Sequence, residues 1–338
     1  MPNKRKYAIV LFVILINAVI VGIVFNPGIL EAVISRIPKI NTGDAVAVHY
    51  IDVGQGDAQL IMSDGMAMLI DAGPNSMEDS LLLYLKAQDI DELEYAVFTH
   101  PHEDHIGGAD MILQKFKVNN VIMPDVTHTS DTFLRMLEAV EKSDSKLIIA
   151  VSGREYDFGG ASFKILAPTA DNYTELNDWS VVIRLTYGIT SFMFTGDAEI
   201  MSENDIMKKY DAFELKCDVY KAGHHGSTTS NSAPFLAACN PEFAVISCGK
   251  KNEYGHPHSG ILKLFSEMNI GVYRTDIDGT VVFKSNGLTV SKIKQYGPLV
   301  FLTPKGPEVM DARFIRRLHR LRHPVHRVYT TEDLPLYR

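Results

Sequence analysis

Cysteine and tryptophan are scarce in this chain, and no repeat or low-complexity segment interrupts it. Its 338 residues include one tryptophan and three cysteines, Cys217, Cys239 and Cys248. An odd cysteine count without metal-like spacing excludes a disulfide scaffold, and we expect the three thiols to be small buried apolar groups. With 46% hydrophobic and 22% charged residues, the composition also excludes a disordered or collagen-like chain. The length allows one large domain or two of ordinary size.

In the middle of the chain, positively charged residues are far fewer than negatively charged ones. Residues 1–30 contain three cations and no acid, and residues 301–338 contain eight Lys or Arg against four acids. Taken from totals of 33 and 41, this leaves 22 cations and 37 acids in residues 31–300, a net charge of −15. An acidic body between two basic ends is not the footprint of a protein that coats nucleic acid.

Charge is also absent from residues 7–25, which read YAIVLFVILINAVIVGIVF. As a helix this run would be about 28 Å long, close to the thickness of a bilayer core. Three cations precede it, so residues 1–30 predict a single membrane-spanning anchor with a cytoplasmic N-terminus and an exported body. Secretion after signal cleavage is the alternative, and a core helix is disfavoured because every face is apolar.

Residues 44–296 alternate apolar strands with amphipathic helices and form the predicted hydrolase domain. Strands are expected near residues 46–51, 58–62, 66–70 and 95–98, and Asp64-Gly65 between two of them is a hairpin signal. A helix is expected at 106–116, and a second group of strands lies at 162–166, 181–186 and 190–195. Helices interleaved with two groups of strands predict a layered α/β fold with helices outside the sheets.

Potential metal ligands concentrate where the strand at 95–98 ends. Residues 99–108 read THPHEDHIGG, with three imidazoles and two carboxylates within six positions. His100 and His102 alternate by two and can point the same way, while Asp104 and His105 can reach a second point nearby. Imidazole nitrogen and carboxylate oxygen suit zinc, manganese or iron. Two metals roughly 3.5–4 Å apart would activate a shared water and clamp the attacking and leaving oxygens.

The run at 99–108 resembles the signature of the metallo-β-lactamase superfamily, and other motifs follow in that family's order. They are LIDAG at 69–73, FTGD at 194–197 and AGHHGS at 222–227. DVGQGDA at 52–58 and YGHP at 254–257 narrow the resemblance to the hydrolase domains of the ComEC family of DNA-uptake proteins. It covers about residues 46–294 and implies a four-layer αβ/βα sandwich of two mixed sheets flanked by helices, here as a standalone membrane-anchored relative.

The resemblance also implies a site for two divalent metal ions, zinc or manganese. His100 and His102 would bind the first metal, and Asp197 would bridge the two. The second metal would be bound by Asp104, His105 and His224. Asp71 and Asp57 would lie behind the ligands, with Asp71 orienting a ligand imidazole.

One position departs from the family's pattern. Where many members supply a third imidazole to the first metal, this chain reads LNDWS at 176–180. Either Asp178 replaces that imidazole or the first site is one ligand short. Asn177, a candidate substrate-binding residue, and Asp178 could equally form an ordinary turn or a helix cap.

Several residues beside the expected ligands suit substrate binding or proton transfer. His225 and His256 could bind the scissile group or protonate a departing oxygen, with Asp104 as the third catalytic residue. Ser227 would bind substrate, although a turn cap explains it too. Lys221 could balance a substrate anion or be a solvated surface lysine.

The C-terminal tail, residues 297–338, is a separate basic segment. Residues 313–323 contain five Arg and two His around apolar residues at helical spacing. This pattern suits contact with anionic lipid, a cell-wall polymer or DNA, and a solvated tail is the alternative.

These features predict a phosphodiesterase or nuclease that acts on extracellular DNA through a metal-bridging hydroxide. DNA is favoured only through the family resemblance, because the motifs indicate metal-dependent hydrolysis and not a substrate. One alternative is a wall-associated phosphoester hydrolase such as a phosphorylcholine esterase. Another is a non-catalytic surface protein that binds DNA or polymer.

Overall fold

The computed structural model describes residues 45–293 without a gap, together with 31, 34, 35, 37–40, 42 and 43 and the backbone of 300–303 and 306–309. The apolar run at 7–25 and the arginine-rich run at 313–323 lie outside these residues. Among the residues described, no helix is long and apolar enough to cross a bilayer.

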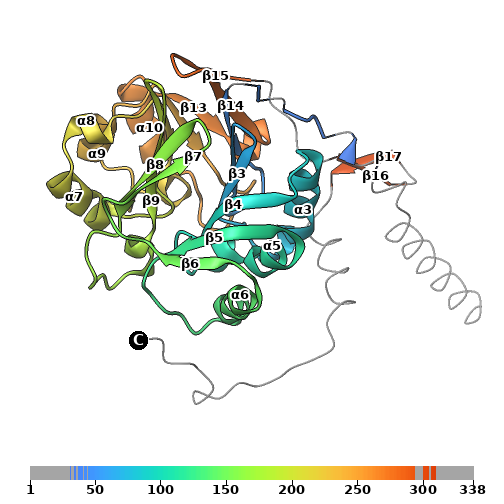
Figure 1. Cartoon of the computed structure of the whole chain (residues 1–338). Coiled ribbons are helices and arrows are strands. Elements are labelled where there is room, and N and C mark those ends of the chain that lie inside the picture. Colours follow the sequence, from blue (N-terminus) through green and yellow to red (C-terminus); the bar gives the residue numbers. More distant parts are fainter. Residues whose placement is uncertain are drawn as a thin grey trace, which may run out of the picture.

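Two mixed β-sheets form the middle of the molecule (Figure 1). In spatial order, the first contains β15 (Val290–Lys292), β14 (Val281–Ser285), β1 (Val46–Tyr50), β2 (Gln59–Ser63), β3 (Met66–Ile70), β4 (Glu92–Val97), β5 (Lys117–Met123) and β6 (Lys146–Ile149). The second contains β13 (Gly271–Arg274), β12 (Phe243–Ile246), β11 (Val219–Lys221), β10 (Thr190–Phe194), β9 (Val182–Tyr187), β8 (Ala161–Ala167) and β7 (Glu155–Phe158). A separate hairpin joins β16 (Val300–Thr303) to β17 (Gly306–Val309).

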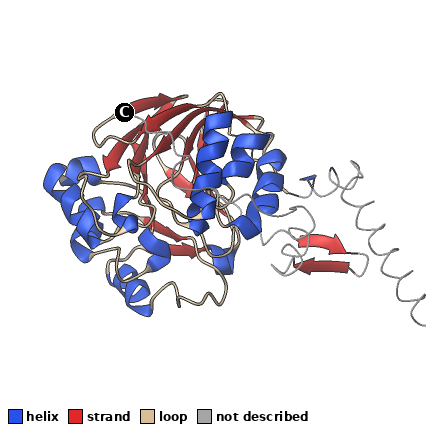
Figure 2. Cartoon of the chain, turned by 90° about the horizontal axis from the view of Figure 1, so that it is seen from below, coloured by secondary structure: helices blue, strands red, loops and turns tan. Residues whose placement is uncertain are grey.

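Helices lie on both sides of the strands (Figure 2). Those that follow strands of the first sheet are α3 (Glu78–Ala87), α4 (Glu103–Ile106), α5 (Ala109–Lys115) and α6 (Asp131–Lys142). Those of the second sheet are α7 (Ile200–Lys209), α8 (Ala212–Leu215), α9 (Ala233–Cys239), α10 (Ser259–Glu267) and α11 (Thr275–Asp278). Short 3-10 turns, η1 (Asn75–Met77), η2 (Leu176–Trp179) and η3 (Gly223–Gly226), lie between them. This confirms the αβ/βα sandwich of two mixed sheets.

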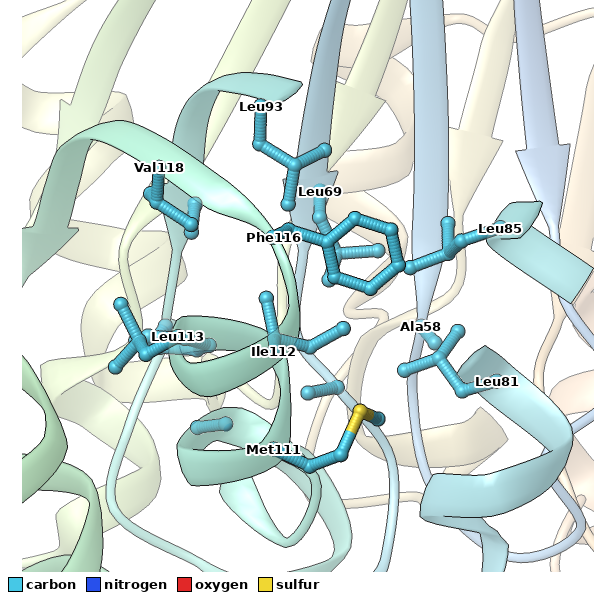
Figure 3. Close-up of a cluster of buried hydrophobic side chains, with 14 of the residues drawn as sticks. Ala58, Leu69, Leu81, Leu85, Leu93, Met111, Ile112, Leu113, Phe116 and Val118 are labelled. Carbon is cyan, nitrogen blue, oxygen red and sulfur yellow. The ribbon is translucent and has the colours of Figure 1, made fainter. Parts of the chain in front are cut away.

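Three apolar clusters hold the layers together. Because successive side chains of a strand point to opposite faces, Leu69 of β3 packs under the helices while Met68 and Ile70 pack between the sheets. Figure 3 shows the cluster under α3 and α5, where Leu85 and Phe116 meet Leu69. A third cluster fills the space under the helices of the second sheet. Strands buried on both faces explain why the strand segments are almost continuously apolar.

Two local features differ from the sequence-based expectation. The helix expected at 106–116 is interrupted at Gly107 and Gly108, so α4 and α5 are separate. A Cβ on Gly107 would lie 2.1 Å from the Asn75 nitrogen, so only glycine allows this approach. Strand β7 was not expected, because it is a polar edge strand in which only Phe158 is buried.

The strands give the molecule two different ends. Strands β3, β4 and β5 run parallel, as do β10, β11 and β12, so their carboxyl ends lie together. The turns of the hairpins β2–β3, β7–β8, β9–β10 and β14–β15 lie at the opposite end. We call these the carboxyl end and the hairpin end.

A buried histidine links the first sheet to its helices. His49 of β1 is fully buried, and its Nδ1 lies 2.8 Å from the hydroxyl of Tyr84 on α3. Burial lowers the pKa of His49 from 6.5 to about 3, so the ring stays neutral in the folded protein.

Because His49 is buried in its neutral form, the stability of the fold should decrease at acidic pH. Between pH 6.5 and about 3 the unfolded chain binds a proton at His49 that the folded chain does not. The free energy of unfolding should therefore fall on acidification, by at most about 1.4 kcal/mol per pH unit for this group. Urea titrations of metal-free protein from pH 7 to 4.5 should show a shallower loss of stability in His49→Gln than in the wild type. His128→Gln, on the loop after β5, should keep the wild-type slope. Equal slopes for wild type and His49→Gln would contradict the assignment.

Candidate metal centre

The segments that leave the carboxyl end converge on one cluster of imidazoles and carboxylates. Asp71 follows β3, the run from His100 to His105 follows β4, Asp197 follows β10, and His225 follows β11. Groups whose ligand atoms lie within 4.8 Å of one another include His100, His105 and Asp197, and Asp104, His105 and His225. The structure therefore brings together most of the residues that the sequence motifs singled out.

Two imidazoles define the first point of convergence. Nε2 of His100 and Nδ1 of His102 lie 2.9 Å apart. Nε2 of His100 also lies 3.9 Å from Oδ2 of Asp197. On its far side, Nδ1 of His100 lies 3.1 Å from the Thr99 hydroxyl, which fixes the ring with Nε2 facing the cluster.

The second point of convergence shares Asp197 with the first. Its Oδ2 lies 3.2 Å from Nε2 of His105 and 3.5 Å from Nε2 of His225. Oδ2 of Asp104 lies 3.1 Å from the same His225 nitrogen. The buried Oδ1 of Asp197 has no hydrogen-bond partner among the described residues. Imidazole nitrogens thus surround a shared carboxylate, Asp197, whose second oxygen is unpartnered. These are ligands that fit two divalent cations.

Asp71 lies directly behind the ligands. Its Oδ2 is 2.8 Å from Nδ1 of His105 and accepts a bond from the Thr99 hydroxyl, while its Oδ1 accepts from the Thr99 amide. Burial raises the pKa of Asp71, although His105 and the Thr99 amide oppose that shift. The geometry is that of a carboxylate that orients a ligand imidazole, as expected for this residue.

The two consecutive histidines exchange the places that the sequence suggested. His225 is 1% exposed and joins the cluster, with Nδ1 3.0 Å from the Ser247 carbonyl. The side chain of His224 is 23% exposed, and its Nε2 lies 3.8 Å from Oδ2 of Asp197. His224, predicted as a ligand, thus lies at the partly exposed edge of the cluster, which we call the opening, and His225, predicted as a catalytic group, lies within the cluster.

A strained turn produces this arrangement. His224 has φ 49° and His225 φ 55°, both in the left-handed region that non-glycine residues avoid at a cost of about 1–2 kcal/mol each. The buried Asn231 side chain donates to the carbonyls of Gly223 and Ser227 and accepts from the Gly223 amide. Glu203 of α7 accepts from the Asn231 amide. Sequence inspection missed both residues, because neither belongs to a ligand motif.

An ion pair lies beneath the cluster. Nζ of Lys221 is 2.7 Å from Oδ2 of Asp57, and both side chains are at most 1% exposed. Oδ1 of Asp57 lies 3.6 Å from Nδ1 of His225, so Asp57 lies behind the ligands as expected. Lys221 is neither a surface lysine nor available to a substrate. The preceding Gly56, at φ 139°, allows close packing because a Cβ would lie 2.3 Å from the Asp104 carbonyl.

Two candidates have structural roles instead. Oδ1 of Asp178 accepts from the amides of Glu199 and Ser202 at the start of α7, which is helix capping, and Asp178 is in none of the convergent groups. Its expected role as a replacement ligand is not supported. Ser227 is 2% exposed and bonds to the Thr229 hydroxyl and amide, so it closes a turn and does not face a substrate.

The remaining candidates lie near His224. Asn177 donates to Glu199, and its Nδ2 lies 3.5 Å from Nδ1 of His224. His256 stacks against His225 with ring centroids 6.1 Å apart. Burial, followed by the neighbouring His225, lowers the pKa of His256 to about 4. A ring that is neutral at pH 7 is a poor proton donor, so its expected acid role is not favoured.

The electrostatics of the cluster favour bound positive charge. Burial tends to raise the pKa values of Asp197 and Asp104, but His105 and His225 outweigh it and hold both below the usual range. Burial tends to lower the pKa of His105, but Asp197 and Asp71 raise it well above the usual range. The buried carboxylates favour positive charge nearby, which without metal is supplied by a proton on an imidazole such as His105. Bound divalent cations would supply the same positive charge.

Replacing His225 and replacing His224 should affect the metal content differently. His225→Ala should lose about one of two metal equivalents per chain, because a ligand of the second point of convergence is removed. His224→Ala should retain both, and it is a matched control one residue away. Metal content is measured by mass spectrometry after dialysis of zinc- or manganese-loaded protein. Loss of metal in His224→Ala with retention in His225→Ala would contradict the placement.

The chain is similar to known proteins in sequence and in fold. Residues 51–250 match the Metallo-beta-lactamase superfamily. The crystal structure of the metallo-beta-lactamase fold protein YhfI from Bacillus subtilis covers 72% of this chain and 100% of its own, with a TM-score of 0.50 and 14% identity. That likeness concerns the fold alone.

Three curated relatives have names that refer to the ComE operon, to recombination and to competence. ComE operon protein 3 of Bacillus subtilis is 31% identical over 70% of this chain and 33% of its own length. Recombination protein 2 of Haemophilus influenzae is 31% identical over 69% of this chain and 28% of its own length. Competence protein ComA of Neisseria gonorrhoeae is 27% identical over 79% of this chain and 37% of its own length. The chain therefore spans about a third of the length of these relatives. This chain belongs to the metallo-β-lactamase superfamily of metal-dependent hydrolases.

Proposed function

We propose that this chain hydrolyses phosphodiester bonds in DNA, with two divalent cations, zinc or manganese, held by the cluster. The observation that carries the proposal is the pair of ligand groups that share Asp197, one with His100 and the other with His105 and His225. The names of the relatives, which refer to competence and recombination, support DNA as the substrate.

The ligand residues suit charge stabilisation at a phosphate. His100, His102 and Asp197 would hold one cation, and Asp104, His105, His225 and Asp197 the other. Bound there, divalent cations would polarise a phosphoryl oxygen and lower the pKa of a water molecule. Asp71, Thr99 and the Ser247 carbonyl keep the ligand rings in place and so limit reorganisation during the reaction.

His224 is placed to assist the substrate directly. Its Nδ1 lies 3.0 Å from the Thr229 hydroxyl and 3.2 Å from Oε1 of Glu199, which fixes the ring from behind. Its Nε2 faces the cluster at the opening. We propose that Nε2 binds a phosphoryl oxygen or transfers a proton to the departing oxygen.

An exposed loop beside the opening suits a nucleic acid strand. Lys250 and Lys251 are exposed, and Tyr254 is 58% exposed in a body that is otherwise acidic. The Tyr254 ring stacks on His256 with centroids 5.6 Å apart and remains more than half exposed. Cations for the backbone and an open aromatic face for a base are what single-stranded nucleic acid requires.

We also propose that residues 7–25 anchor the chain in the cell membrane with the hydrolase domain outside the cell, or are removed as a signal. The uncharged run behind three cations supports this placement. Residues 313–323 would contact anionic lipid, wall polymer or DNA through their arginines.

The first test of function compares three substrates. Metal-loaded wild type should hydrolyse single-stranded DNA and bis(p-nitrophenyl) phosphate but not a chromogenic β-lactam. Asp104→Ala and His105→Ala should lower the phosphodiester rate by about 100-fold or more, because each removes a ligand. Asp125→Ala, an exposed carboxylate after β5, should keep the wild-type rate. Turnover of the β-lactam alone would contradict the proposal.

A second test asks whether Tyr254 stacks on a base. Tyr254→Ala should raise KM for single-stranded DNA about 5- to 150-fold, the equivalent of about 1–3 kcal/mol, with kcat nearly unchanged. Tyr254→Phe keeps the ring and should behave as wild type. On a strand of abasic sites the Ala and Phe variants should have similar KM values. An equal loss on both strands would show that the ring does not contact a base.

A further inference from the structure

The hairpin end carries apolar side chains with no cover among the described residues. Ile189, in the turn between β9 and β10, is 79% exposed, and Leu288, in the turn between β14 and β15, is 69% exposed. The Ile189 amide donates to the Gly287 carbonyl at 2.7 Å, so the two turns lie side by side. A Cβ on Gly188 would lie 2.3 Å from that carbonyl, so glycine is required for this contact.

The other hairpin turns lie beside this pair. The Gly159 amide, between β7 and β8, donates to the sulfur of Met66, which is 42% exposed at the start of β3. Met66 adds a third exposed apolar side chain, which like Leu288 belongs to the first sheet. We call Ile189, Leu288 and Met66 the apolar tips. Single exposed apolar residues are ordinary, but three on adjacent turns form a patch.

The chain enters the folded body at the same end. The Gln88 side chain, at the C-terminus of α3, donates to the Pro38 carbonyl and accepts from the Ile40 amide. Ile37 and Ile40 are at most 7% exposed, so this segment is packed against the body. Farther along, Val46 pairs with Ser285 just before the β14–β15 turn. Residues 38–40, 42, 43, 45 and 46 therefore lie along the hairpin end.

The connection to the apolar run at 7–25 is short. Residues 26–37 can span at most about 40 Å when fully extended. A body of this size has a radius of gyration of about 18 Å and thus a diameter of about 45 Å. If residues 7–25 lie in a bilayer, this connection is too short to bring the carboxyl end to the membrane surface. The hairpin end then lies closer to the lipid than the carboxyl end does.

We propose that the hairpin end is a membrane-docking surface, with Ile189 and Leu288 inserted at the interface of a phospholipid bilayer. The proposal rests on the membrane anchor proposed above and not on the hydrolysis. Exposed carboxylates such as Asp64 lie in the neighbouring turn, so insertion is driven by apolar contact and does not depend on anionic lipid.

Docking at this end would fix the orientation of the metal centre. The β10 strand and the residues to Asp197 extend away from the Ile189 turn, and eight residues in extended form cover roughly 25 Å. The opening at His224 would then face away from the bilayer. A substrate that arrives from outside the cell would reach it without contacting lipid.

The test measures the environment of a fluorophore at each end of the molecule. Cys217, Cys239 and Cys248 are buried, so an introduced exposed thiol can be labelled selectively with a nitrobenzoxadiazole dye. Leu288→Cys tests the hairpin end. Ile277→Cys is the matched control, because Ile277 is also 69% exposed but lies on α11, at the carboxyl end. Metal content of each variant checks that it is folded.

Full-length protein is reconstituted into phosphatidylcholine vesicles and recovered by flotation. The label at position 288 should emit at shorter wavelength than in detergent-free buffer and be quenched by nitroxide-bearing lipids, and the label at 277 should show neither effect. Ile189→Cys should behave like Leu288→Cys. Flotation with no shift at 288, or equal shifts at 288 and 277, would overturn the docking surface while leaving the anchor intact. Protein that does not float would overturn both, and phosphodiester turnover measured on the same samples reports separately on the hydrolase.

Discussion

Burial of negative charge at the carboxyl end is the constraint on which the rest of this structure depends. Asp57, Asp71 and Asp197 are each at most 2% exposed, and each has an oxygen within 4.8 Å of a ring nitrogen of His105. Buried carboxylates are stable only when hydrogen bonds or cations compensate for the lost water. Asp71 has Thr99 and His105, and Asp57 has Lys221. Asp197 has imidazoles near Oδ2 but no hydrogen-bond partner on Oδ1 among the described residues, so bound cations would compensate for its buried charge.

The parallel strands and the contacts around the His224–His225 turn hold the ligand side chains in place. The parallel strands deliver each ligand at a chain segment that leaves a buried sheet, where the backbone is rigid. The turn at His224 and His225 is strained, and Asn231 and Glu203 hold it from the neighbouring α7–α9 region. Strain at a site persists only where surrounding bonds over-determine it, as they do here. The two adjacent imidazoles consequently point to different places, one among the ligands and one at the opening.

The sequence predicted what depends on local spacing and missed what depends on contacts between distant segments. His100, His102, Asp104 and His105 are neighbours on one loop, so their convergence follows from their spacing. The choice between His224 and His225 depends on left-handed backbone angles and on Asn231, which no motif encodes. Lys221 looked solvated because its partner, Asp57, comes from the other sheet. Asp178 could be a ligand or a cap by sequence, and the start of α7 decides for the cap. The layers were predictable because strands buried on both faces are nearly continuous apolar runs.

The net charge of −15 in residues 31–300 is not spread evenly over the folded body. Part of it is buried at the carboxyl end, where bound cations would reverse the local sign. Lys250 and Lys251 are exposed on the loop that leads to His256, whose ring centroid lies 5.3 Å from that of His224. A polyanion would thus be repelled by most of the body and attracted only at the site. At the hairpin end an exposed carboxylate such as Asp64 would oppose attraction to anionic lipid, so the proposed docking would depend on the apolar tips. With metal bound, the proposed substrate opening and the proposed docking surface would lie at opposite ends of one acidic body.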